Sequence, residues 1–350
     1  MEKFINILKS GAIYFGQNPQ GWEQDFFARL YFVIIASFVM LFIPFLITLI
    51  FPFLKKDTLS KKGSVILYAF VTGFFITMAL FGFLRESLEK SSLSAKAEGF
   101  SGWSLYGWNI LLVGGGLTAG LSFGWFLRFI VKKATSSKIK EDPKASLYIH
   151  IHDLSHDHEH EAHDHSNIAL NHKISHKEVT NKKSDTKLKI VALLLLLTHR
   201  IPAGFLIGYS FNAFFTTGAQ FGALNAAFLI SFILHLIPEE IIFYYRQREM
   251  GISKWKAVFN SFASLLLFIP LMLLGIYLGK YINQIWQLSA FVQAMISGTF
   301  LFTAIIEFLP EINHAHHDKK FIKKVLFVFL LGIIICATIL SFHDHGTYNF

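Results

Sequence analysis

Three ionisable side chains interrupt an apolar stretch, SFILHLIPEEIIFYY, which runs from Ser231 to Tyr245. His235 and Glu239 are four residues apart, so on a helix they share one face. An imidazole and a carboxylate at this spacing can chelate one metal ion, and zinc accepts nitrogen and oxygen ligands in four-coordination. Glu240 follows directly as a third ionisable side chain of the stretch. The stretch therefore predicts a metal site inside an apolar helix.

A second apolar stretch contains THRIPAG, with His199 beside Arg200. A lone histidine within a membrane helix is more often a packing residue than a metal ligand. His199 is therefore a candidate ligand only if a second metal-binding side chain lies nearby. Arg200 has a structural role open to it, because a buried guanidinium needs a carboxylate. Glu239 or Glu240 on a neighbouring helix would supply one. The sequence thus predicts either a metal ligand set or an ion pair, and both readings stay open.

Further candidates lie close to these residues along the chain or in other apolar runs. Glu307 and Glu311 occur in IIEFLPEI, near the end of another apolar run, where solvation makes a carboxylate less costly. Proline removes a backbone donor and kinks a helix, which frees carbonyls that must be satisfied inside the protein. Pro202 and Pro238 predict such kinks next to the two histidines.

Composition indicates that these residues sit in a membrane protein. Of the 350 residues, 53% are hydrophobic and only 16% are charged, which points to a bilayer rather than a water-soluble core. The formal net charge of +9 does not indicate nucleic acid, because the lysines and arginines fall between apolar runs. The only cysteine, Cys336, lies in an apolar run, so no disulfide framework is expected.

A helix needs about 20 mainly apolar residues to cross the hydrocarbon, and eight runs qualify. The predicted spans are residues 27–53, 64–84, 107–131, 188–211, 221–245, 256–279, 289–311 and 322–342. We therefore predict an all-α integral membrane protein with eight transmembrane helices.

Alternate loops carry most of the 32 lysine and arginine residues, among them LKKDTLSKKG, RQREMGISKWK and DKKFIKK. Basic residues are retained in cytoplasmic loops, so these loops are expected to be cytoplasmic and both termini extracytoplasmic. The start of the chain, MEKFINILKSGAIYFGQNPQ, has no sustained apolar core or cleavage site and is interpreted as mature sequence. The expected segments are an extracytoplasmic region 1–26, spans in 27–131, a cytoplasmic loop 132–187, spans in 188–342 and a tail 343–350.

The loop between the third and fourth spans contains a tract of histidine and acidic residues from His150 to His176. Such a segment is too polar to bury a core and is expected to be disordered. Imidazole and carboxylate together suit zinc and neighbouring divalent metals, so metal contact is expected ahead of a solvated charged linker or a tract resembling a purification tag. The expected loop contacts for metal are His150, His152, His156, His158, His160, His163 and His165.

With these spans, this loop and these motifs, the sequence resembles the ZIP (Zrt/Irt-like) family of divalent metal transporters. That family has eight spans, outside termini and a histidine-rich loop after the third span. Its fourth-span motif His-Asn-x-Pro-Glu-Gly corresponds to residues 199–204, and its fifth-span motif His-x-x-Pro-Glu to residues 235–239. The stretch SGTFLFTAIIEFLPEI resembles the seventh span, and Gly73 to Glu86 resembles the second. The resemblance implies a ZIP-like bundle of eight helices.

The departures from the family pattern fall on its chemistry. The family's bridging glutamate is Ala203 here, and its asparagine is Arg200. In the second span, Gly82 and Arg85 replace the usual histidine and proline, and Ile269 precedes Pro270 where some members have an acid. The resemblance therefore implies His199, His235 and Glu239 as metal ligands, completed by Glu240 or water, with Arg200 as a fixed cation at the second site.

The resulting expectation is a transporter that moves a divalent metal, zinc first, into the cytoplasm by alternating access. Fe²⁺, Mn²⁺ and Cd²⁺ remain open, because the same ligands serve them. Glu307 and Glu311 would help the ion to leave, and the loop histidines would receive or sense it. No cofactor and no enzyme activity are expected. The partners are the metal ion and the lipid bilayer of the cell membrane, and a second copy of the chain is kept as a candidate.

Three alternatives carry weight. A ZIP-fold metal sensor, or a paralogue with impaired transport, would fit Ala203 and Arg200. An intramembrane metalloprotease would need a His-Glu-x-x-His motif, which the chain lacks. An exporter of another fold would also have a histidine-rich loop, but such exporters usually have fewer spans and place His and Asp at helical spacing.

Overall fold

The computed structural model describes residues 2–9, 22–54, 59–139, 200–216, 223–249, 251–313 and 318–342. Every regular element in these ranges is a helix, as the apolar runs predict. Within the described residues, six helices, some built from several consecutive elements, are long and apolar enough to cross a membrane: Trp22–Phe53, Lys62–Ala97, Gly102–Ile130, Lys254–Ile282, Trp286–Ile312 and Lys320–Leu340. Large apolar side chains such as Phe38 and Phe327 are exposed on the outside, where bilayer lipid would solvate them. The chain is a multi-pass membrane protein.

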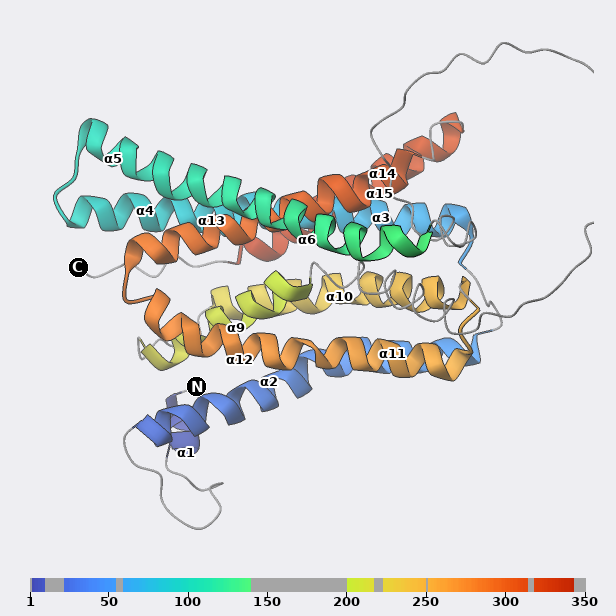
Figure 1. Ribbon diagram of the computed structural model, residues 1–350, viewed down its shortest axis with the longest axis horizontal. Helices are drawn as coiled ribbons and strands as arrows, with labels where there is room; N and C mark the ends of the chain where they lie inside the picture. The colour runs from blue at the N-terminus through green and yellow to red at the C-terminus, as the bar shows by residue number, and fades with distance from the viewer. Residues whose placement is uncertain are drawn as a thin grey trace, which may run out of the picture.

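The helices form two bundles that lie one above the other in Figure 1. The α10 bundle contains α2 (Trp22–Ile50), α9 (Arg200–Thr216), α10 (Ala223–Glu249), α11 (Lys254–Leu266) and α12 (Phe268–Ile282). The short helix α1 (Glu2–Lys9) packs on α2, and a 3₁₀ turn, η1 (Phe51–Phe53), follows α2.

The second bundle, the α13 bundle, contains α3 (Lys61–Thr77), α4 (Arg85–Ala97), α5 (Gly102–Asn109), α6 (Gly115–Ile139), α13 (Trp286–Phe302), α14 (Leu309–Asn313) and α15 (Lys319–Leu340). Three π-helical segments, η2 (Met78–Leu84), η3 (Ile110–Gly114) and η4 (Thr303–Phe308), join its consecutive helices. The two bundles meet where α10 packs on α3 and α15, and where α9 packs on α13.

Each bundle is built on a pair of helices in close contact. Between α6 and α13, a Cβ on Gly120 would lie 1.9 Å from the carbonyl oxygen of Met295. Between α9 and α12, a Cβ on Gly208 would lie 1.9 Å from the carbonyl oxygen of Met272. Only glycine fits at these two positions, because any Cβ would overlap the facing carbonyl oxygen. Small residues of this kind let helix backbones approach closely in a membrane.

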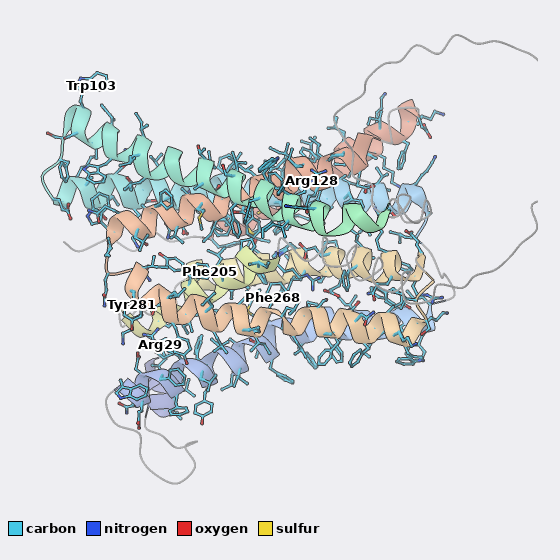
Figure 2. All side chains as sticks on the ribbon, viewed as in Figure 1. Arg29, Trp103, Arg128, Phe205, Phe268 and Tyr281 are labelled. Atoms are coloured by element: carbon cyan, nitrogen blue, oxygen red, sulfur yellow. The ribbon has the colours of Figure 1, made fainter. Side chains whose placement is uncertain are left out.

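A buried arginine ties three helices together at one end of the α10 bundle. Arg29 of α2 donates from Nη1 to Asn212 of α9 and, at 3.2 Å, to the carbonyl oxygen of Ile276 on α12. Its Nε donates to Asp25 at 3.0 Å, and Lys280 also pairs with Asp25 at 3.1 Å. Figure 2 shows Arg29 at the same end of the molecule as Tyr281 and Trp103.

The structure corrects one expectation about a loop. The segment between the second and third predicted spans, 85–106, is helical through Ala97, and the turn covers only residues 98–101. Its mean hydropathy is low, but one face of α4 packs on α13 and buries Ser87, Ser91 and Ala95. Ser87 donates a 2.7 Å hydrogen bond to the carbonyl oxygen of Ala290, so tertiary contacts and not hydropathy keep this segment helical.

The other predicted spans correspond to helices, with shifted ends. The sixth is divided at Leu267 into α11 and α12. Pro270 explains the division, because its ring clashes with the carbonyl four residues earlier and it has no N–H to donate. The fourth and fifth predicted spans include α9, which begins at Arg200, and α10, which begins at Ala223; residues 188–199 and 221–222 of these spans lie outside the described residues.

Candidate metal centre

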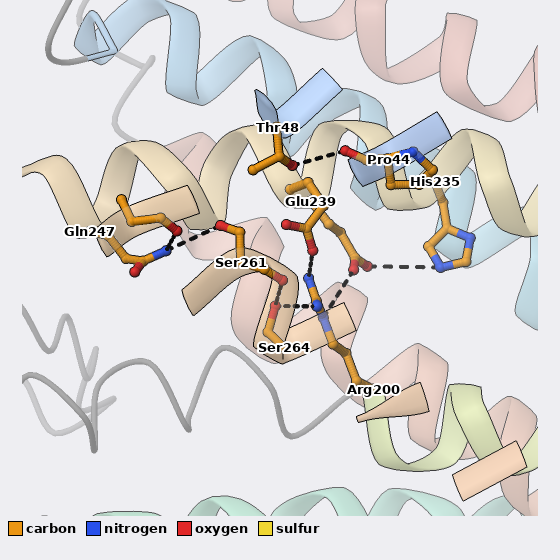
Figure 3. A network of polar contacts seen from close by, with 10 residues as sticks. Pro44, Thr48, Arg200, His235, Glu239, Gln247, Ser261 and Ser264 are labelled. Atoms are coloured by element: carbon orange, nitrogen blue, oxygen red, sulfur yellow. Dashed lines mark hydrogen bonds and ion pairs between the residues drawn. The ribbon is translucent and has the colours of Figure 1, made fainter. Parts of the chain in front are cut away.

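The candidate centre lies inside the α10 bundle, where α10 faces the start of α9 and the end of α11 (Figure 3). Helix α10 supplies His235, Glu239 and Glu240, and α9 supplies Arg200. All four side chains are buried, with relative exposures of 1%, 6%, 0% and 2% respectively. Buried charges are tolerated only when they are paired or bind a metal, so this cluster needs an internal balance.

Arg200 provides most of that balance. Its Nη2 donates to Oε1 of Glu240, and its Nε lies 4.0 Å from Oε2 of Glu239. Its Nη1 donates a 2.8 Å hydrogen bond to the hydroxyl of Ser264 on α11. The guanidinium carbon also lies 5.4 Å and 5.7 Å from the ring centroids of Phe243 and Phe268. The planar guanidinium is therefore fixed between two carboxylates, a hydroxyl and two aromatic faces.

His235 lies one turn before Glu239, and its Nε2 is 4.0 Å from Oε1 of Glu239. Its Nδ1 is 3.3 Å from the backbone carbonyl oxygen of Ser231. Because a carbonyl oxygen can only accept, this contact is a hydrogen bond in the tautomer that carries its proton on Nδ1. The lone pair is then on Nε2, the atom that faces Glu239. A metal-binding histidine usually has this arrangement, with its other nitrogen donating to a carbonyl or carboxylate.

Aromatic rings surround the imidazole. The ring centroid of His235 lies 4.5 Å from that of Phe232 and 5.2 Å from that of Phe75 on α3. Phe74 lies somewhat farther away, at 6.2 Å. His235 is thus at the boundary between the two bundles, in contact with α3 of the α13 bundle.

The cluster contains two buried carboxylates and one buried guanidinium. One guanidinium faces two carboxylates, so one negative charge is left when both carboxylates are ionised and the histidine is neutral. The excess lies on the Glu239 side, since the shorter contact of Arg200 is with Glu240. Chemically, the arrangement can hold a cation between His235 and Glu239 while Arg200 neutralises Glu240.

The other predicted site residues are placed as follows. Pro202 is near the described start of α9, and Pro238 is inside α10, one residue before Glu239. Glu307 is partly exposed in η4, and Glu311 in α14 pairs with Arg246 of α10 at 2.8 Å. His199 and the seven loop histidines lie outside the described residues. In the parts of the chain that are described, no three His, Cys, Asp or Glu side chains come close enough to form a complete metal site.

The structure also adds contacts that the sequence did not indicate. Ser264 and the rings of Phe243 and Phe268 hold Arg200, yet these residue types are common in apolar helices and carry no signal by spacing. Arg246 was counted only as a basic residue of a cytoplasmic loop, but it lies in α10 and contacts α3 and α14.

Comparison with known proteins gives matches to one family of transporters. The model of a family described as ZIP zinc transporter matches residues 28–340. Zinc transporter ZIP10 of Homo sapiens is 28% identical over 123 residues, which cover 35% of this chain and 14% of that protein. Zinc transporter ZIP10 of Danio rerio is 26% identical over 158 residues, or 43% of this chain and 18% of that protein.

The aligned stretches thus cover only a small part of these longer relatives, whereas the family model covers most of this chain. The matched range includes all the described helices from α3 to α15 and the cluster around Arg200. The resemblance noted in the sequence is confirmed, and the chain belongs to the ZIP zinc transporter family.

Proposed function

We propose that this protein moves a divalent metal ion, zinc in the first place, across the cell membrane into the cytoplasm. The observation that carries the proposal is the buried pair of His235 and Glu239, whose Nε2 and Oε1 atoms lie 4.0 Å apart. An imidazole nitrogen and a carboxylate oxygen are ligands that zinc accepts. Family membership and the relatives named as zinc transporters support the same cargo. No covalent chemistry is part of the proposal.

The proposed ligands are His199, His235 and Glu239, with Glu240 or water completing the set and Glu307 on the way out. Arg200 would act as a built-in cation at the position of a second metal. Because the guanidinium is a fixed part of the protein and already neutralises Glu240, we expect one metal ion per site. Mn²⁺, Fe²⁺ and Cd²⁺ are alternative cargoes for the same donors.

The proposed mechanism is alternating access, by rocking of the α10 bundle against the α13 bundle. His235 supports it, because this ligand lies at the boundary of the two bundles, in contact with Phe75. We place eight spans in the membrane, with both termini outside and the histidine-rich loop in the cytoplasm, where it would receive or sense the ion.

A second candidate function is a metal sensor, or a paralogue with impaired transport. The observation in its favour is the contact of Arg200 with both Glu239 and Glu240. A guanidinium this close repels a divalent ion unless a carboxylate lies between them. Ala203, which replaces the family's bridging glutamate, is buried and offers no charge.

Zinc uptake into proteoliposomes tests the proposal, with binding measured on the same preparation. We expect saturable uptake by the wild type and loss of uptake in His235→Ala. Intact zinc binding without uptake would overturn transport in favour of the sensor. Absence of both, in protein that is folded in detergent, would overturn a metal-related function at this site.

A further inference from the structure

Another pair of an arginine and a carboxylate lies away from the candidate centre, and this pair joins the two bundles. Nη2 of Arg246 on α10 donates to Oε1 of Glu311 on α14 at 2.8 Å and to the hydroxyl of Tyr68 on α3 at 3.3 Å. The guanidinium carbon lies 5.9 Å from the ring centroid of Tyr68. The side chains of Arg246 and Glu311 are 24% and 19% exposed, and Tyr68 is buried. One guanidinium thus holds two helices of the opposite bundle.

This pair lies on the same face of α10 as the candidate centre. Residues 235, 239, 242 and 246 follow one another at spacings of four, three and four, which places them in one stripe along a helix. Arg246 comes 11 residues after His235, or about 16 Å along the axis. It lies in the last turn of α10 and is the first residue of the basic segment RQREMGISKWK, which predicts the cytoplasmic side.

A continuous series of rings connects the centre to the pair. Phe75 contacts His235, with centroids 5.2 Å apart, and stacks on Phe308 at 5.4 Å. Phe308 in turn lies 5.8 Å from Tyr68, the ring next to Arg246. An ion that leaves the centre along this face of α10 would therefore meet the ring series first and the Arg246–Glu311 pair at its end.

The chemistry of the pair suggests how it opens. A carboxylate can bind a guanidinium or a divalent cation, and charge-assisted hydrogen bonds of this kind are strong. Resting on the transport function proposed above, we infer that Arg246 is a tethered cation that closes the cytoplasmic end of the metal route by holding Glu311. The outgoing ion takes the place of the guanidinium on Glu311, and the two bundles part at this end.

Access to a cysteine placed between the centre and the pair tests this inference. Ile242 is buried, lies between Glu239 and Arg246 on the same stripe, and can be replaced by cysteine in a Cys336→Ser background that removes the only native thiol. A membrane-impermeant thiol reagent is applied from the cytoplasmic side of inside-out vesicles. The labelling rate of Ile242→Cys then reports opening at this end.

We expect slow labelling of the parent and faster labelling when zinc is added. Arg246→Gln should label about tenfold faster than the parent, the ratio that corresponds to loss of one charge-assisted hydrogen bond, and zinc should add little. The matched control is Arg248→Gln, since Arg248 donates to the carbonyl of Ile252, just past the end of α10, and does not join the bundles through that contact. In the double variant Arg246→Glu with Glu311→Arg, the two charges are exchanged, and the labelling rate should return to the slow rate of the parent.

Equal labelling of the parent and Arg246→Gln would overturn the inference, as would equal acceleration by Arg248→Gln. The labelling does not depend on flux. If the wild type takes up no zinc but Arg246→Gln still labels faster, the transport function fails and the closing role of Arg246 stands. If uptake is normal and labelling is unchanged, the inference fails and the transport function stands.

Discussion

Nε2 of His235 and Oε1 of Glu239 lie 4.0 Å apart, and both side chains are buried on one face of α10. This separation is too long for a direct hydrogen bond. Two zinc bonds of about 2 Å at a tetrahedral angle would place such atoms roughly 3.3 Å apart. A small rotation of the Glu239 side chain is therefore enough for both atoms to bind one ion.

Loss of either donor is expected to weaken zinc binding. His235→Ala and Glu239→Gln should each lower affinity by at least about tenfold, because loss of even an outer partner of a metal ligand costs that much. Isothermal titration calorimetry with zinc measures the change. Glu249→Gln is the matched control, since it makes the same replacement at the end of α10. Unchanged affinity in both site variants would place the bound ion elsewhere.

Arg200 and Glu240 are expected to depend on each other for stability. Arg200→Leu leaves Glu240 buried without its guanidinium, which should destabilise the protein by about 3–5 kcal/mol. In the double variant Arg200→Leu with Glu240→Leu, much of that loss should be recovered, because an apolar pair can replace a buried ion pair. Thermal unfolding in detergent checks both. Additive losses in the double variant would contradict a coupled pair.

Restoring the family pattern should change the number of ions bound. In Arg200→Asn with Ala203→Glu, a carboxylate replaces a buried methyl group and the tethered cation is removed. The excess of negative charge can then be balanced by a second divalent ion, so we expect zinc stoichiometry to rise from one to two and uptake to increase. Elemental analysis of the purified protein and the uptake assay measure these. A fall in uptake at unchanged stoichiometry would mean that Arg200 takes part in a working, altered mechanism.

Local patterns predicted much of the fold and part of the candidate centre. The apolar runs correspond to helices, because a membrane span satisfies its own backbone, and the four-residue spacing brings His235 and Glu239 to one face. Hydropathy did not predict helix α4, whose serines are buried by packing on α13. Nor did the sequence predict that Glu240, and not Glu239, is the closer partner of Arg200. It also gave no sign that Arg246 reaches Glu311. Such pairings depend on how helices distant in the chain are packed, which spacing within one helix does not encode.

Close packing of α6 on α13 should be sensitive to a single methyl group. In Gly120→Ala, the new Cβ would lie 1.9 Å from the carbonyl oxygen of Met295 and must push the helices apart. Overpacking of this kind costs roughly 1–3 kcal/mol, so thermal unfolding should occur at a lower temperature. Gly107→Ala is the matched control, because a Cβ there meets nothing within 4 Å and alanine favours a helix by up to about 1 kcal/mol over glycine. If both variants unfold at the wild-type temperature or above it, α6 and α13 are not packed as closely as described.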